Sequence, residues 1–364
     1  MNCCFSSFNM CRFLIYKGRE PMLLSNLLTK PAHSIINQSF DSRLRIDHQP
    51  INGDGFGVGY YTLEDEENEM NSGKVSGPCV YKAITPAWNN LNLQRLAEKT
   101  RSRMIFAHVR SSTYGVLSET NCHPFTYHNL MFMHNGGICN FRKIKRRLMS
   151  HIEDEFFLTI QGATDSECSF SLFLDTLYKM GYDPKLDRAI PAEIMRLALV
   201  KTIQYIKDWV TDLHLEDTDP SLMNFAVTDG ESIVVSRYVT SKTDEAASLY
   251  FSTGSKFIEV AQGQFKMERL NRSQDIIMVA SEPLTFERGD WISMPTNSTL
   301  TIRKQIVMLH PIIDEFYQEN PTFIRSREFA ESKGLMGMIP KEDISDKEVP
   351  PLEREGRSRA GLTV

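Results

Sequence analysis

The sequence lacks several features that would place it in a special class of protein. No stretch approaches the roughly 20 apolar residues that a membrane-spanning helix needs, and the first residues lack the basic start and long apolar run of a secretory signal. The seven cysteines are odd in number, irregularly spaced and without a C-x-x-C pair, which argues against a disulfide framework or a zinc site. The net charge of −5 gives no support for binding to nucleic acid or to an anionic membrane. These absences predict a soluble, reduced protein of the cytoplasm.

What is present is a chain of 364 residues in which strand and helix patterns are mixed. Apolar segments at 11–18, 55–61, 104–110 and 129–136, and many more after residue 222, are typical of strands. Helical spacing occurs at 89–103, 165–180 and 191–210. Helix pairs beside many β segments favour an α+β fold over a regular βαβ repeat. The tail 321–364 is rich in mixed charges, and we expect it to be mobile.

Cys11 is the first residue with possible chemistry. If Met10 is the initiator and is removed, Cys11 carries its thiol and a free α-amine on one residue. An α-amine has a pKa of about 8, so it can act as the general base for its own nucleophile. The alternative is a buried structural thiol at the start of a strand.

Three further clusters supply polar groups. Arg110, at a strand end, is suited to bidentate capture of a carboxylate, although a surface ion pair is also possible. The side chain of Asn135 and the N–H of Gly136 can converge on one oxygen as an oxyanion hole, or Asn-Gly can form a simple turn. Asp165 can hold an ammonium group, while Thr164 and Glu167 fit a helix capping box.

Together these clusters describe recognition of a glutamyl group through both charges on its α-carbon, with attack at its side-chain carbonyl. Two other interpretations are weak. The spacing in GDGFGVG (53–59) is not that of a phosphate-binding loop, and no basic residue follows it. The histidines form no recognised metal-ligand pattern, so neither a metal nor another cofactor is expected.

After Cys11, the chain carries a series of motifs in the order DGFGVG, H-x-R-x-x-T-x-G, HNG, TDSE and ASEPL. This series resembles the class II glutamine amidotransferase domain of the N-terminal-nucleophile hydrolases. The resemblance implies a four-layer αββα sandwich with Cys11 as nucleophile and with Asn135 and Gly136 as the oxyanion hole. It also implies that Arg110 and Thr113 hold the substrate α-carboxylate and that Asp165 holds the α-amine. By the same resemblance, the Asp54 turn and the His123-Pro124 segment are scaffold.

Three segments are similar to the amidotransferase-like subunit of the fungal alternative glutathione-degradation complex: MCRFLIYKG, PTNSTLTIRKQ and HPIIDEFY. This resemblance extends the expected domain to 11–320 and leaves residues 1–10 as a leader or a mis-assigned start. It implies glutathione as substrate and a larger partner subunit with a metallopeptidase region. Two alternatives stay open: a generic amidotransferase that releases ammonia from glutamine, and a catalytically silent subunit of a peptidase complex.

Overall fold

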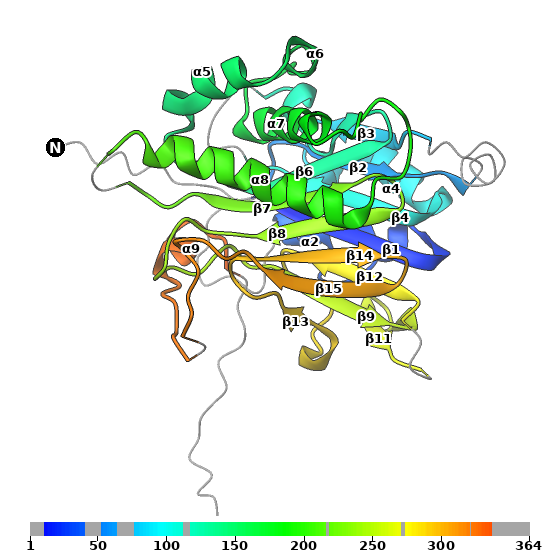
Figure 1. Cartoon of the computed structure of the whole chain (residues 1–364). Coiled ribbons are helices and arrows are strands. Elements are labelled where there is room, and N and C mark those ends of the chain that lie inside the picture. Colours follow the sequence, from blue (N-terminus) through cyan, green and yellow to red (C-terminus); the bar gives the residue numbers. More distant parts are fainter. Residues whose placement is uncertain are drawn as a thin grey trace, which may run out of the picture.

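Two antiparallel β-sheets lie face to face in the computed structural model, which describes residues 11–40, 52–63, 76–111, 117–215, 218–270, 274–320 and 322–336 (Figure 1). The seven-stranded sheet has the order β13-β9-β12-β1-β4-β2-β3. Its strands are β1 (Arg12–Leu23), β2 (Phe56–Tyr60), β3 (Cys79–Ala83), β4 (Arg101–Val109), β9 (Tyr250–Gly254), β12 (Ile276–Ala280) and β13 (Ile292–Ser293).

The six-stranded sheet has the order β15-β14-β8-β7-β6-β5. Its strands are β5 (Phe125–Tyr127), β6 (Leu130–Gly137), β7 (Leu222–Thr228), β8 (Ser232–Arg237), β14 (Ser298–Arg303) and β15 (Ile306–Pro311). A separate hairpin is formed by β10 (Lys256–Ala261) and β11 (Gln264–Glu268).

Alternation along β1 shows how the layers are built. Phe13 and Ile15 point into a core between the two sheets, whereas Leu14 and Tyr16 point into a second core on the outer face of their sheet. Successive strand side chains face opposite sides, so a strand that is apolar at every position is buried on both faces. The uninterrupted apolar run therefore specifies a central strand of a layered fold.

Helices cover the outer face of each sheet. The seven-stranded sheet packs against α1 (Ser25–Leu28), α2 (Ile35–Phe40) and α4 (Leu91–Lys99). The six-stranded sheet packs against α5 (Phe141–His151), α6 (Asp154–Phe157), α7 (Asp165–Lys179) and α8 (Ala192–Thr211). Figure 1 shows α7 and α8 lying over the strands of this sheet. The predicted four-layer αββα sandwich is confirmed.

Two sequence-based boundaries differ from the structure. Residues 101–103, expected to end a helix, begin β4 instead, because Ser102 is buried and pairs with Met22 of β1. The packed structure also extends past residue 320, into the tail expected to be mobile. There, α9 (Glu328–Ser332) and Leu335 bury apolar side chains against Leu222, Val239, Ala246 and Ala247.

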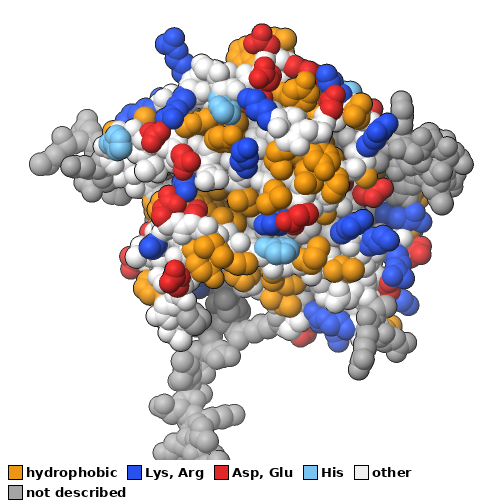
Figure 2. Space-filling model, viewed as in Figure 1, with side chains coloured by type: hydrophobic (Ala, Val, Ile, Leu, Met, Phe, Trp, Pro, Cys, Tyr) orange, Lys and Arg blue, Asp and Glu red, His pale blue; other side chains and the backbone are white. Residues whose placement is uncertain are grey.

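Strand β15 lies at one edge of the six-stranded sheet. Its exposed side chains include Ile306, Met308 and Leu309, and apolar side chains are interspersed with charged ones over the face seen in Figure 2.

None of the helices in the described part of the chain combines the length and apolar character that a membrane crossing requires.

Candidate active site

A cavity of about 440 Å³ opens where the strand ends of both sheets meet the first turns of α5 and α7. This volume lies within the range of small-molecule sites, roughly 300–1,000 Å³. Four of the six predicted catalytic and substrate-binding residues line it: Cys11, Arg110, Gly136 and Asp165. They come from positions up to 154 residues apart in the chain, so the fold brings them together.

Cys11 lies directly before β1, beside the end of β4. Because Arg12 pairs with Val109, the neighbouring thiol reaches Ser111, whose carbonyl oxygen is 3.5 Å from Cys11 Sγ. Burial raises the pKa of the Cys11 thiol, an effect that the nearby Arg110 guanidinium only partly opposes. The site therefore keeps the sulfur protonated at neutral pH, and a reaction at this atom needs a base.

Arg110 follows β4 and is held by the turn at Asp54. The N–H of Arg110 donates to the Gly55 carbonyl at 2.8 Å, and its own carbonyl accepts from the Asp54 N–H at 3.2 Å. Gly55 has a φ of +115°, and a Cβ there would lie 2.8 Å from Ala83 O. The turn thus needs glycine and positions the backbone of Arg110. Thr113, the predicted partner of Arg110, falls within 112–116, outside the described residues.

Asn135 and Gly136 lie within β6, so they do not form the simple turn that their sequence also allowed. Gly136 lines the cavity with a φ of +153°, and a Cβ there would overlap the Leu222 carbonyl oxygen. Asn135 does not line the cavity: its side chain is buried, and its Nδ2 donates to Ser281 Oγ at 3.0 Å. The Oδ1 atom of Asn135 is buried and has no hydrogen-bond partner among the described residues.

Asp165 is the first residue of α7 and faces the end of β6. Its Oδ2 accepts from the Ile138 N–H at 2.9 Å, and its Oδ1 accepts from the Ser166 N–H at 2.9 Å. A carboxylate at a helix N-terminus is favoured by the helix dipole, so this site holds a fixed negative charge beside the cavity.

Only one of the two hydrogen bonds of the predicted capping box forms at the start of α7. Thr164 Oγ1 accepts from the Glu167 N–H at 3.2 Å, as the box requires. The Glu167 carboxylate instead accepts from Gln161 N and Gly162 N, at 2.8 and 2.7 Å. Glu167 thus fixes the loop before the helix and does not close the box.

Three buried imidazoles, those of His108, His123 and His134, stand beside the cavity, and the sequence pattern predicted no common role for them. His108 Nε2 donates to the His134 carbonyl oxygen at 3.1 Å, and the centroids of the His108 and His123 rings lie 4.0 Å apart. Burial lowers the pKa of His108 to about 3 and lowers the pKa of His123 and His134 as well. His123 lines the cavity, and neither of its ring nitrogens has a hydrogen-bond partner among the described residues.

Comparison with known proteins shows the family of this chain. Residues 24–318, more than half of the chain, match the family model of class II glutamine amidotransferases. The chain belongs to this family. It is 65% identical over 359 residues to the probable glutamine amidotransferase DUG3 of Saccharomyces cerevisiae, and the match covers 98% of this chain and 99% of that protein. Class II amidotransferases hydrolyse γ-glutamyl amide bonds, so this chain is an enzyme of that kind.

More distant relatives share part of the chain or its fold. A γ-glutamyl-hercynylcysteine sulfoxide hydrolase of Mycobacterium tuberculosis is 27% identical over 175 residues, or 48% of this chain and 63% of that protein. The solved class II domain protein of Silicibacter pomeroyi is similar at a TM-score of 0.54 with 23% identity, over 84% of this chain and all of that one. At this identity the structural likeness shows the fold alone.

In this amidotransferase one wall of the cavity comes from the C-terminal segment, which contributes Phe329 and Lys333. Sequence reasoning missed these residues because it treated the segment as a tail. Arg12 connects the segment to Cys11: its Nη1 donates to the Cys11 carbonyl and its Nη2 to the Gly334 carbonyl, both at 3.1 Å.

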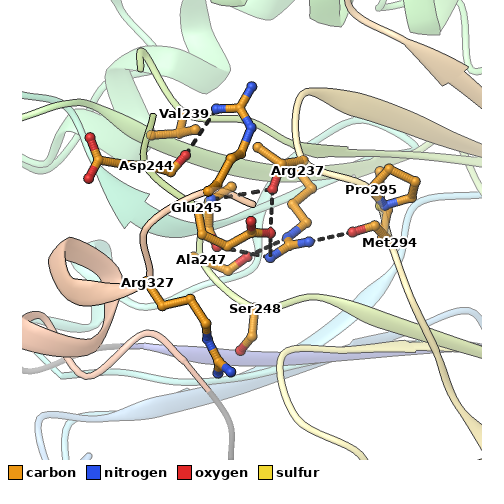
Figure 3. A network of polar contacts seen from close by, with 12 residues as sticks. Arg237, Val239, Asp244, Glu245, Ala247, Ser248, Met294, Pro295 and Arg327 are labelled. Atoms are coloured by element: carbon orange, nitrogen blue, oxygen red, sulfur yellow. Dashed lines mark hydrogen bonds and ion pairs between the residues drawn. The ribbon is translucent and has the colours of Figure 1, made fainter. Parts of the chain in front are cut away.

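A buried arginine holds the loop on which this segment rests (Figure 3). Arg237 donates to the carbonyls of Ala246, Ala247 and Met294 and pairs with Glu245. The backbone of the loop then bonds to the segment, through Glu245 N to Ser326 O at 2.7 Å and Ser248 N to Leu335 O at 2.8 Å. The position of Lys333 is therefore set by the core of the enzyme.

Proposed function

We propose that the mature enzyme begins at Cys11 and cleaves γ-glutamyl amides with this residue as both nucleophile and base. The α-amine takes the thiol proton, and the thiolate attacks the γ-carbonyl carbon of the substrate. The tetrahedral intermediate then expels the amine leaving group, which takes the proton from the α-ammonium. Water attacks the resulting γ-glutamyl thioester, its proton passes to the α-amine, and glutamate and the thiol are released.

The cavity supports this assignment of roles. Arg110 and Asp165 present one positive and one negative side chain beside Cys11, matching the α-carboxylate and α-ammonium of a glutamyl group. Because burial raises the pKa of the Cys11 thiol, the surroundings do not favour the thiolate. A base on the same residue can remove the thiol proton. The neighbouring imidazoles have lowered pKa values and accept protons weakly.

The oxyanion hole combines the Gly136 N–H with the Asn135 amide after a rotation. With Asn135 Nδ2 on Ser281, the buried Oδ1 is left without a partner. A half-turn of the amide group exchanges the two atoms, so that the Ser281 hydroxyl donates to Oδ1 and Nδ2 becomes available to an oxyanion. Ser281 suits this role because its hydroxyl both accepts and donates, and it already accepts from the Phe13 N–H at 3.1 Å.

We further propose glutathione as the physiological substrate, cleaved in the cytoplasm by a complex with a metallopeptidase-type partner that degrades Cys-Gly. The similarity of MCRFLIYKG, PTNSTLTIRKQ and HPIIDEFY to the glutathione-degradation subunits supports this, as does 65% identity to the yeast DUG3 protein. The mycobacterial relative is named for a γ-glutamyl substrate larger than glutamine. The alternatives are release of ammonia from glutamine and a silent subunit that only organises its partner.

Two measurements test the proposal. Intact mass of the protein from its native host should give a chain that starts at Cys11, with a free amine. Cys11→Ala should abolish cleavage of glutathione while assembly is preserved, whereas Cys79→Ala, an exposed thiol on β3, serves as the matched control. A chain that keeps residues 1–10 and still cleaves γ-glutamyl bonds contradicts the mechanism. Full activity of Cys11→Ala in the complex would instead support the silent subunit.

A further inference from the structure

The C-terminal segment, residues 326–336, packs on the rest of the enzyme through a small apolar cluster of its own. Ala330 and Leu335 are almost fully buried in this cluster, which is distinct from the three larger cores of the described structure. Gly334 follows α9 with a φ of +68°, and the Leu335 N–H closes the turn on the Ala330 carbonyl at 2.8 Å. In this conformation the carbonyls of Gly334 and Leu335 both accept hydrogen bonds from residues outside the segment.

The Gly334 carbonyl is connected to Cys11 through a single side chain. Arg12 Nη2 donates to Gly334 and Nη1 of the same guanidinium donates to the Cys11 carbonyl, both at 3.1 Å. The guanidinium is planar and rigid, and the Arg12 side chain is only 2% exposed. The segment therefore helps to fix the backbone of Cys11, while the thiol of the same residue is held by the Ser111 carbonyl.

The Leu335 carbonyl is connected to Asn135 through two serines. Ser248 donates its N–H to the Leu335 carbonyl and its hydroxyl to the Ser281 carbonyl, both at 2.8 Å. Ser281 Oγ in turn accepts from Asn135 Nδ2 at 3.0 Å. All four residues are buried, and a buried hydrogen-bond network makes its members rigid. Two neighbouring residues of one segment are thus bonded, by separate routes, to the proposed nucleophile and to the proposed oxyanion donor.

We propose that docking of the C-terminal segment positions Cys11 and Asn135 for the reaction. Gly334 and Leu335 are then positioning residues, since neither of them lines the cavity. The inference rests on the proposed roles of Cys11 and Asn135 in γ-glutamyl cleavage and adds a part of the chain that those roles require. Reacting groups must be held within about 0.5 Å of their productive geometry, and a misplacement of about 1 Å can lower the rate about 10²-fold.

The first test releases the segment by Leu335→Asp, which places a charge in its apolar cluster. The enzyme is assayed as isolated from its host together with the proteins bound to it. We expect kcat for glutathione to fall about 10²-fold. Alkylation of Cys11 by iodoacetamide at pH 8 should become about tenfold faster, because the thiol loses its enclosed position. Ala330→Asp should reproduce both effects, whereas Ile324→Asp, at a side chain that is 91% exposed, is the matched control and should show neither.

A second test addresses the route to Asn135 without releasing the segment. Ser248→Ala removes the hydroxyl bond to Ser281 and keeps the N–H bond to Leu335. We expect kcat to fall about tenfold while the alkylation rate of Cys11 stays unchanged. This mild substitution also tests the proposal if either aspartate variant fails to fold, and an unchanged kcat contradicts the connection to Asn135.

Phe329→Ala separates positioning from the shape of the cavity. Phe329 lines the cavity, and its removal changes the wall while the carbonyls of Gly334 and Leu335 keep their bonds. It should raise KM and leave kcat unchanged. A loss of kcat equal to that in Leu335→Asp would show that the segment serves only as a wall, and full kcat in both aspartate variants would show that it is dispensable; either result overturns the proposal.

Failure of the proposed function gives a different result. If the unmodified enzyme cleaves no γ-glutamyl bond, the proposed function is overturned. The alkylation rates need no turnover, so they still decide whether the segment holds Cys11: equal rates in the unmodified enzyme, Leu335→Asp and Ala330→Asp overturn the connection.

Discussion

The guanidinium of Arg12 and the carboxylate of Glu282 form a buried ion pair, 2.5 Å between Nε and Oε1, although 270 residues separate them in the chain. Both side chains are almost fully inaccessible to solvent. Since Arg12 also bonds to Cys11 and Gly334, the pair connects the segment after β12, Cys11 and the C-terminal wall of the cavity. Its loss therefore affects stability and the active site together.

Breaking this ion pair should destabilise the protein strongly. Glu282→Gln leaves the Arg12 charge buried without its counter-ion, so we expect the free energy of unfolding to fall by about 3–5 kcal/mol. Urea unfolding measures the loss. Arg147→Ala is the matched control, because it breaks an ion pair of 2.8 Å between side chains that are about half exposed and should cost about 0–1 kcal/mol. Equal effects in the two variants would contradict the assigned importance of the buried pair.

The pH dependence of the reaction distinguishes the α-amine from other bases. An α-amine accepts a proton only in its neutral form, so kcat/KM should rise about tenfold per pH unit and level off near pH 8. If the thiol had to ionise by itself, the plateau would lie above the ordinary thiol value of 9.0, because burial raises the pKa of Cys11. Steady-state kinetics on glutathione provide the profile. Loss of the rise in His123→Asn, with folding intact, would assign the base to His123.

Buried neutral histidines should make the protein sensitive to mild acid. Burial lowers the pKa of His108 to about 3, whereas an unfolded histidine titrates near 6.5. Below pH 6.5 the unfolded chain therefore binds a proton that the folded chain does not, and stability falls as the pH drops toward 3. Each such histidine contributes a slope of about 1.4 kcal/mol per pH unit. Urea unfolding at several pH values should show a shallower slope for His108→Gln, and an unchanged slope would contradict the prediction.

The proposed rotation of the Asn135 amide has its own test. Asn135→Ala removes an oxyanion donor and should lower kcat by about 10²–10³-fold. Ser281→Ala removes the hydroxyl that holds the rotated amide, so we expect a smaller loss of kcat, about tenfold, with KM little changed. Ser252→Ala is the control, since its hydroxyl on β9 is equally buried but has no hydrogen-bond partner among the described residues. Unchanged kcat in Ser281→Ala would show that Ser281 does not position the amide.

Much of the fold was predictable because local patterns in the sequence indicate individual strands and helices. Apolar runs predicted the central strands β1, β4 and β6, and a Thr164 cap with apolar residues at helical spacing predicted α7. The helix α5 was missed, since it buries only Phe141, Ile144 and Leu148 and presents basic residues at most other positions. Its core contacts come from a narrow apolar stripe, which is a weak local signal.

The sequence by itself determined which groups are available for chemistry: a thiol, a cation, an anion and an Asn-Gly pair, in an order shared with a family of amidotransferases. Only the tertiary structure decided which of them meet. It placed Cys11, Arg110, Gly136 and Asp165 around one cavity, buried Asn135 against Ser281, and brought Lys333 to the same cavity. Local patterns record the period of a strand or helix, whereas these contacts arise from strand pairing and packing between segments far apart in the chain.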